Sequence, residues 1–181
     1  MRGMAERRAG EGAGLRARAV LADTGRSHVA TGLPVLDFVL SLLADYALLD
    51  LSLDVEPGSA AAGAAAAGRA LGEAIGAHLR REGARGHGSA VLPADESLAQ
   101  VSLEVSGRPL VVSNVDLSAA HVGGLGSDVV SDFLHELAAA AGLTLHVRLI
   151  EGSDPQHALE AIFKALGAAL GDAAQLRTRK D

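Results

Sequence analysis

Three side chains in the last third of this 181-residue chain have the chemistry of metal ligands. His157 and Glu160 are three residues apart in a segment with helical spacing, so they project from one face near the helix start. His146 lies in residues 143–150, which have the pattern of a strand. Imidazole nitrogen and carboxylate oxygen bind divalent metals, so this strand and helix start predict part of a metal site. The alternative is a surface helix with an incidental His–Glu pair, because short motif matches often arise by chance.

The helix that would position His157 and Glu160 has start signals in the sequence. Asp154 is suited to cap the helix, and Pro155 suits its first turn. The apolar residues that then recur at helical spacing are Leu159, Ile162, Phe163 and Leu166. Within residues 151–170, a helix is therefore predicted to begin after the Asp154 cap, just before the two candidate ligands.

The sequence repeats itself at a distance of 95 residues. Without a gap, Asp132 and Phe133 fall on Asp37 and Phe38, and Leu166 and Gly167 fall on Leu71 and Gly72. The chain is therefore predicted to be an internal duplication, and each half should consist of strand, strand, helix, strand and helix. Under the same shift Gln156, His157 and Glu160 fall on Ala61, Ala62 and Ala65. Only the second half keeps polar groups at these positions.

The expected elements give an α+β fold of two half-domains in one compact unit. We expect a flexible tail at residues 1–14, half-domains at 15–92 and 93–172, and a polar tail at 173–181. Strands are expected at 15–21, 27–31, 48–55, about 97–105, 110–115 and 143–150. Helices are expected from Pro34, after 57–59, at 128–141 and, after the Asp154 cap, within 151–170. The Gly-rich residues 82–93 are expected to be a connector.

The composition limits the classes of function. Apolar residues make up 49% of the chain, enough for a core, although aromatic residues make up only 2%. The formal charge is −6 and a sustained basic face is missing, which argues against nucleic-acid binding. There is no cysteine, so disulfides and thiolate metal sites are excluded. No apolar run is long enough for a membrane span and no signal-peptide pattern is present, so we expect a cytoplasmic protein.

A Gly-rich loop, GGLGS at residues 123–127, precedes the helix expected at 128–141. Exposed N–H groups at a helix start can bind phosphate, and this loop resembles part of the Gly-rich loop of homoserine and galactose kinases. The proline of that motif is absent and the chain is short for that fold. A turn with a serine cap is therefore the favoured interpretation, and a small-molecule kinase is a minor alternative.

Five motifs occur in order along the chain: TGLP at 31–34 with Asp37, PADESL at 93–98, SGRP at 106–109, LHV at 145–147 and EAIFKA at 160–165. Together they resemble the imidazoleglycerol-phosphate dehydratase family, manganese enzymes of histidine biosynthesis, over about residues 25–172. The resemblance implies the ribosomal protein S5 domain 2-like fold, an α+β arrangement of tandem ββαβα half-domains. It also implies a symmetric shell of subunits with sites formed between neighbours.

The resemblance implies eight metal ligands, and most of them are replaced. The first-helix histidine corresponds to Phe38, the first H-H-x-x-E motif has Ala61, Ala62 and Ala65 at its ligand positions, and the second has Gln156 for one histidine. Only His146, His157 and Glu160 are kept, as a residual partial site. Because alanine has no lone pair, manganese is expected to bind weakly or not at all.

Two further residues correspond to substrate contacts of the family. By this resemblance Glu96 is a candidate catalytic residue and Arg108 a candidate phosphate contact. The arginine of the family's R-Y-G motif corresponds to Gly86, so part of the phosphate-binding charge is missing. The alternative is that Glu96 and Arg108 serve the fold, as an ion pair or a turn contact.

These observations leave three classes of function. The first is a dehydratase-like protein that is catalytically impaired or inactive and has a structural or regulatory role. The second is a working lyase with a remodelled site, and the third is the kinase. For the first we expect a homo-oligomer, alone or mixed with a catalytic paralogue, without nucleic-acid or membrane partners.

Overall fold

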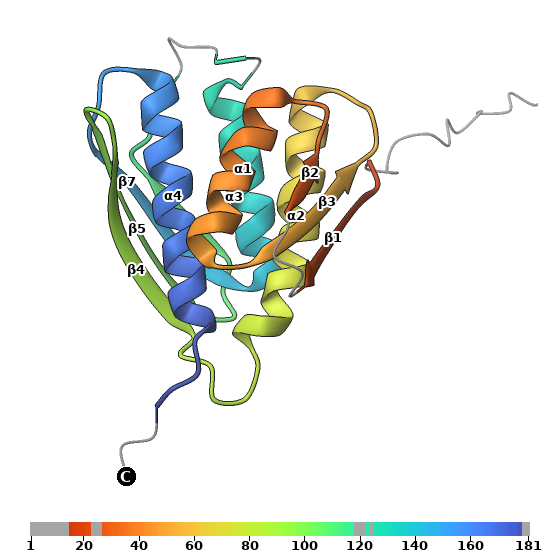
Figure 1. The fold of residues 1–181 in the computed structure, drawn as a ribbon, viewed down its shortest axis with the longest axis vertical. Coiled ribbons are helices and arrows are strands. Elements are labelled where there is room, and N and C mark those ends of the chain that lie inside the picture. The colour runs from red at the N-terminus through yellow and green to blue at the C-terminus, as the bar shows by residue number, and fades with distance from the viewer. Residues whose placement is uncertain (1–14, 23–26, 118–121, 124, 179–181) are drawn as a thin grey trace, which may run out of the picture.

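The computed structural model describes residues 15–22, 27–117, 122–123 and 125–178. Two sheets form the outer layers and the helices lie between them (Figure 1). The first half contains β1 (Ala17–Ala22), β2 (His28–Ala30), α1 (Pro34–Ala47), β3 (Asp50–Val55) and α2 (Ala60–Leu79). The second half contains β4 (His87–Ala94), β5 (Ser97–Val105), β6 (Leu110–Ser113), α3 (Ser127–Ala141), β7 (Leu143–Glu151) and α4 (Pro155–Ala174). The expected α+β class is confirmed.

The two halves share their topology. In the first, β1 pairs antiparallel and β2 pairs parallel with the central strand β3. In the second, β5 pairs antiparallel and β6 pairs parallel with β7. α4 begins 95 residues after α2 begins and ends 95 residues after α2 ends. The caps also correspond, because Ser59 and Asp154 each accept a hydrogen bond from a first-turn N–H group. The repeat predicted from the sequence therefore extends to the helix caps.

The segment at residues 82–93 is more than a connector, and our expectation for it was wrong. Most of it forms β4, which pairs antiparallel with β5 along its whole length. α4 covers β4 so closely that a Cβ on Gly88 would overlap the Ala169 carbonyl group. The second half is therefore βββαβα, and the boundary expected between residues 92 and 93 falls inside a strand.

Small residues let the helices approach closely, which explains how a core forms with few aromatic side chains. α2 packs on α3 and α4 packs on α1, so each contact joins the two halves. Gly72 in α2 and its equivalent in α4, Gly167, each face a backbone carbonyl of the neighbouring helix. Phe133 and Phe163 fill the centre, with ring centroids 5.4 Å apart.

In the described part of the chain, no helix has the length and apolar character needed to cross a membrane.

Replacing Gly72 by alanine should destabilise the protein, although alanine is the better helix former. A Cβ there would lie 2.7 Å from the Leu137 carbonyl oxygen, so α2 and α3 would have to move apart. Overpacking of this kind typically costs about 1–3 kcal/mol of the free energy of unfolding. In the control Gly63→Ala, the Cβ meets only the Thr31 carbonyl oxygen at 3.9 Å, and alanine should stabilise by about 0.5–1 kcal/mol. Urea unfolding measures both variants, and equal effects would contradict this account.

Candidate functional site

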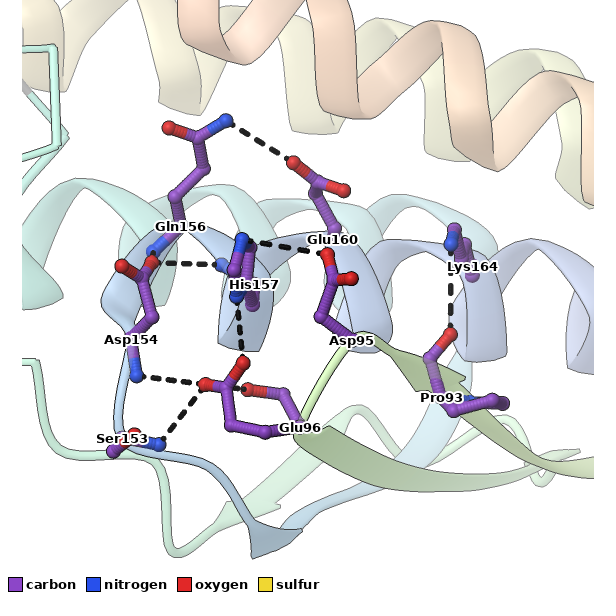
Figure 2. A network of polar contacts seen from close by, with 10 residues as sticks. Pro93, Asp95, Glu96, Ser153, Asp154, Gln156, His157, Glu160 and Lys164 are labelled. Atoms are coloured by element: carbon purple, nitrogen blue, oxygen red, sulfur yellow. Dashed lines mark hydrogen bonds and ion pairs between the residues drawn. The ribbon is translucent and has the colours of Figure 1, made fainter.

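Glu96 is the centre of a polar network at the start of α4. It follows Asp95 in the tight turn between β4 and β5, where Asp95 has a positive φ of 48°. The Oε1 atom of Glu96 accepts hydrogen bonds from the backbone N–H groups of Asp154 at 2.9 Å and Ser153 at 3.3 Å. The β4–β5 turn is thereby tied to the loop that leads into α4 (Figure 2).

The second oxygen of Glu96 binds His157. Glu96 Oε2 lies 2.6 Å from His157 Nδ1, and His157 Nε2 lies 3.4 Å from Asp95 Oδ2. The Asp154 N–H group and the His157 ring lower the pKa of Glu96 to about 2. The hydrogen bond to Glu96 raises the pKa of His157. In mildly acidic solution the ring is therefore an imidazolium, which donates from both nitrogens.

Gln156 and Glu160 form a second contact on the same helix. Gln156 Nε2 donates a hydrogen bond to Glu160 Oε1 at 3.1 Å, one turn further along α4 (Figure 2). Gln156 occupies the position where the H-H-x-x-E motif has a histidine. Its amide can hold the carboxylate in place by this bond, and it engages one oxygen that would otherwise be open to a cation.

The Glu96–His157 pair should give the stability of the protein a characteristic pH dependence. The lowered pKa of Glu96 means that its contribution is fully present above the ordinary value of 4.5 and is lost as the pH falls toward about 2. The raised pKa of His157 means that its contribution is fully present below the ordinary value of 6.5 and is lost as the pH rises through the raised value. The loss of unfolding free energy in His157→Gln should therefore be largest between pH 4.5 and 6.5.

Urea unfolding of wild type and His157→Gln from acidic to alkaline pH measures this difference. The matched control is His135→Gln on α3, because His135 forms no ion pair with any residue that the structure describes. A loss in His157→Gln that is the same at every pH would contradict the role of the charged pair.

The structure places His146 away from His157 and Glu160. It lies on β7 between Leu145 and Val147, which are fully buried, so its exposed side chain is on the outer face of the sheet. His157 and Glu160 lie on α4, which packs on the inner face (Figure 1). Within one chain the three candidate ligands do not converge. Among the described residues, no three His, Asp or Glu side chains are grouped so that they could hold a metal ion.

Arg108 lies at the opposite end of β5 from Glu96. The nine residues of β5 correspond to a distance of about 30 Å. In the β5–β6 turn, the Arg108 carbonyl accepts hydrogen bonds from the hydroxyl groups of Ser106 at 3.0 Å and Thr144 at 3.2 Å, and its side chain is exposed. Within one chain Glu96 and Arg108 therefore form no ion pair with each other, and Glu96 pairs with His157 instead. Both residues make turn contacts, Arg108 through its backbone carbonyl, and these contacts do not decide between a role in the fold and a role in catalysis.

The first half has an apolar surface where the second half has its polar network. Ala61, Ala62 and Ala65 lie in the first two turns of α2, at the positions equivalent to the polar residues of α4. Phe38, near the start of α1, is 47% exposed. None of these four side chains has a nitrogen or oxygen atom that could bind a metal or a substrate.

Asp95 was not among the predicted site residues, although an Asp–Glu pair where a strand turns back was a signal for polar contacts across the turn. The expected serine cap of the Gly-rich loop is wrong, because α3 begins at Ser127 with Gly126 as its N-cap and no side-chain cap. Residues 118–121 and 124 lie outside the described residues, so the loop as a whole is not tested.

A model of the family described as imidazoleglycerol-phosphate dehydratase matches residues 31–170. Two curated proteins named imidazoleglycerol-phosphate dehydratase illustrate the similarity. The protein of Syntrophobacter fumaroxidans is 38% identical over 161 residues, covering 86% of this chain and 81% of the relative. The protein of Acetivibrio thermocellus is 37% identical over 163 residues, covering 87% of this chain and 81% of the relative.

Solved structures show the same fold. The crystal structure of imidazoleglycerol-phosphate dehydratase from Staphylococcus aureus matches with a TM-score of 0.82 and 30% identity, covering 89% of this chain and 94% of that chain. The Pyrococcus furiosus protein in complex with (S)-C348 matches with a TM-score of 0.81 and 27% identity, covering 91% and 92%. Motifs, fold and sequence identity agree, and the chain belongs to the imidazoleglycerol-phosphate dehydratase family.

Proposed function

We propose that this chain is a dehydratase-like protein of histidine biosynthesis that has lost the dehydration chemistry and has a structural or regulatory role. The start of α2 supports this most directly. α2 and α4 begin at equivalent positions and have equivalent N-cap residues. At the positions where the family has metal ligands, however, α2 has Ala61, Ala62 and Ala65. The backbone geometry is kept there, while every side-chain donor is lost.

The manganese that the family resemblance implies does not fit the residues of this chain. Manganese binds through nitrogen or oxygen donors, which the alanines of α2 and Phe38 lack. In the second half, both ring nitrogens of His157 face carboxylates of the β4–β5 turn. His146 lies on the far face of the sheet. The proposed role therefore involves no metal-dependent step.

The proposed role needs the fold of the family and its ability to assemble. The core-facing residues of α1, α2, α3 and α4 are all apolar or glycine, so the replaced ligands leave the core intact. Alanine at an interface also removes the cost of burying a histidine or glutamate without a metal partner. We therefore propose a homo-oligomer, either alone or mixed with a catalytic paralogue that has complete ligand sets.

Elemental analysis of protein dialysed against Mn²⁺ tests the loss of the metal site. Wild type should retain far fewer than the two ions per chain that a two-metal site holds. A variant that restores donors at four positions, Phe38→His with Ala61→His, Ala62→His and Ala65→Glu, should retain more than wild type. Stoichiometric retention of two ions by wild type would refute the proposal, and circular dichroism of the variant controls for folding.

A working dehydratase with a remodelled site is the alternative. Glu96 and Arg108 are kept, and the Glu96–His157 contact at 2.6 Å has the geometry of an acid–base pair. Such a site would need its missing ligands from neighbouring chains. The family assignment leaves no support for the kinase alternative.

A further inference from the structure

A pocket of about 250 Å³ lies between the strand β6 and the helix α3, and it shares no residue with the Glu96 network. β6 is the last strand of its sheet, so no described strand pairs with its free edge. The apolar lining of the pocket includes Val130 and Leu134 of α3, whose side chains are 4% and 3% exposed. The pocket therefore borders the hydrophobic core and is separate from the candidate site.

Polar groups face the pocket from both walls. Ser127, Ser131 and His135 follow one another at intervals of four residues, so they lie on one face of α3. Ser113 is the polar residue that β6 contributes. An apolar pocket with a few polar groups is the usual form of a small-molecule site.

Two of the serine oxygens are held in place by backbone groups. Ser113 Oγ accepts a hydrogen bond from the Val115 N–H group at 3.1 Å, and Ser127 Oγ accepts one from the Leu117 N–H group at 3.5 Å. In each case the serine oxygen is the acceptor, so the hydroxyl hydrogen is not used. Both hydroxyl groups can therefore donate a hydrogen bond to a ligand.

His135 supplies an acceptor beside these donors. Its Nδ1 atom lies 2.8 Å from the Ser131 carbonyl oxygen, which can only accept, so Nδ1 carries a hydrogen. In the neutral ring, Nε2 is then an acceptor. Nε2 has no hydrogen-bond or ion-pair partner among the residues that the structure describes. Ser131 Oγ lies 3.3 Å from Nδ1 and accepts from it, so this third hydroxyl also keeps its hydrogen for a ligand.

The lining has no acidic side chain, lysine or arginine among the described residues. Asp132 and Glu136 are next to Ser131 and His135 in the sequence, but neither lines the pocket. A phosphate, carboxylate or ammonium group would lose its water here without gaining an oppositely charged partner. An uncharged group that both donates and accepts hydrogen bonds matches the hydroxyl groups and the imidazole. A carboxamide is such a group.

We propose that the pocket between β6 and α3 binds a small uncharged molecule that has an apolar body and a carboxamide end. The apolar body contacts Val130 and Leu134, the amide oxygen accepts from the serine hydroxyl groups, and the NH₂ group donates to His135 Nε2. The volume lies just below the range of about 300–1,000 Å³ that is usual for ligand pockets, so the ligand is no larger than a single substituted ring. The proposal goes beyond the proposed function and does not depend on it.

Benzamide, benzoate and benzamidinium test the proposal, because they have nearly the same shape and differ in charge. Equilibrium dialysis in mildly alkaline buffer measures their dissociation constants whatever the oligomeric state of the protein. Benzamide should bind at least about tenfold more tightly than either charged analogue, because each of these would be desolvated without a charged partner. No saturable binding of benzamide, or binding of a charged analogue as tight as that of benzamide, would overturn the proposal.

Variants of α3 test where benzamide binds. Ser131→Ala and His135→Phe each remove one hydrogen-bonding group, so each should raise the dissociation constant of benzamide by about three- to tenfold. The matched control is Ser41→Ala on α1, a helix serine that is outside the pocket and bonds the Asp37 carbonyl group. It should leave the affinity unchanged, and circular dichroism verifies the folding of all three variants. Benzamide binding that neither α3 variant weakens would overturn the assignment to this pocket.

Discussion

The purified protein supplied with Mn²⁺ should show no measurable dehydration of imidazoleglycerol phosphate. Five of the eight ligand positions that the family resemblance implies have no donor or a changed donor, including Phe38 and the three alanines of α2. Loss of a single group that stabilises developing charge costs about 10²–10³ in rate, so the combined loss should take turnover below detection. The assay must contain added Mn²⁺ and a family member with intact H-H-x-x-E motifs as positive control.

The same assay discriminates between the two candidate functions. Turnover within roughly a factor of 10 of the median enzyme rate of about 10 s⁻¹ would refute the loss of chemistry and favour a remodelled site. In that case Glu96→Gln should abolish the activity, because the amide cannot exchange a proton with His157. Weak activity that is unaffected by Glu96→Gln would indicate a contaminating enzyme.

Much of the fold was predictable because the sequence of the first half is repeated in the second half. The 95-residue repeat identified α2 and α4 as equivalent. In the structure the two helices begin and end at equivalent residues, and their N-cap residues, Ser59 and Asp154, are also equivalent. β4 was not predicted, because Gly88 and Pro93 lower the strand propensity of its sequence. The glycine is explained only by tertiary structure, since α4 passes so close that no Cβ fits.

The sequence predicted several residues of the candidate site, but it did not predict which of them lie close together. Glu96 and His157 are 61 residues apart, and only the β4–β5 hairpin brings them together. The strand pattern placed His146 on the opposite face of its strand from Leu145 and Val147. It did not reveal that α4 covers the face with Leu145 and Val147, so the separation of His146 from His157 and Glu160 could not be predicted.

The strained turn residues were not predictable either. Asp95 and Leu48 both have positive φ, and neither is glycine. The strain of Asp95 accompanies the polar network, in which its carboxylate approaches His157 Nε2 at 3.4 Å. Leu48 is 87% exposed, so its left-handed conformation is accompanied by little packing of its side chain.

The protein should assemble into oligomers that do not depend on metal. In a metal-bridged shell, removal of the ions leaves ligands from different chains without partners, and the contacts between subunits weaken. Here Ala61, Ala62 and Ala65 need no partner, and their small side chains let a neighbouring chain approach closely. Light scattering coupled to gel filtration should therefore give the same mass, well above the 18.3 kDa of one chain, with and without a chelator.

The variant with four restored donors (Phe38→His, Ala61→His, Ala62→His and Ala65→Glu) is the control for this experiment. If it assembles at all, its mass should depend on Mn²⁺ and fall on chelation, because its buried histidines and glutamate need the ion. A wild-type mass near 18.3 kDa in both buffers would show that the chain does not assemble alone. Chelator-induced dissociation of wild type would show that His146, His157 and Glu160 of neighbouring chains still hold bridging ions, which would restore a metal-dependent role for the second half of the chain.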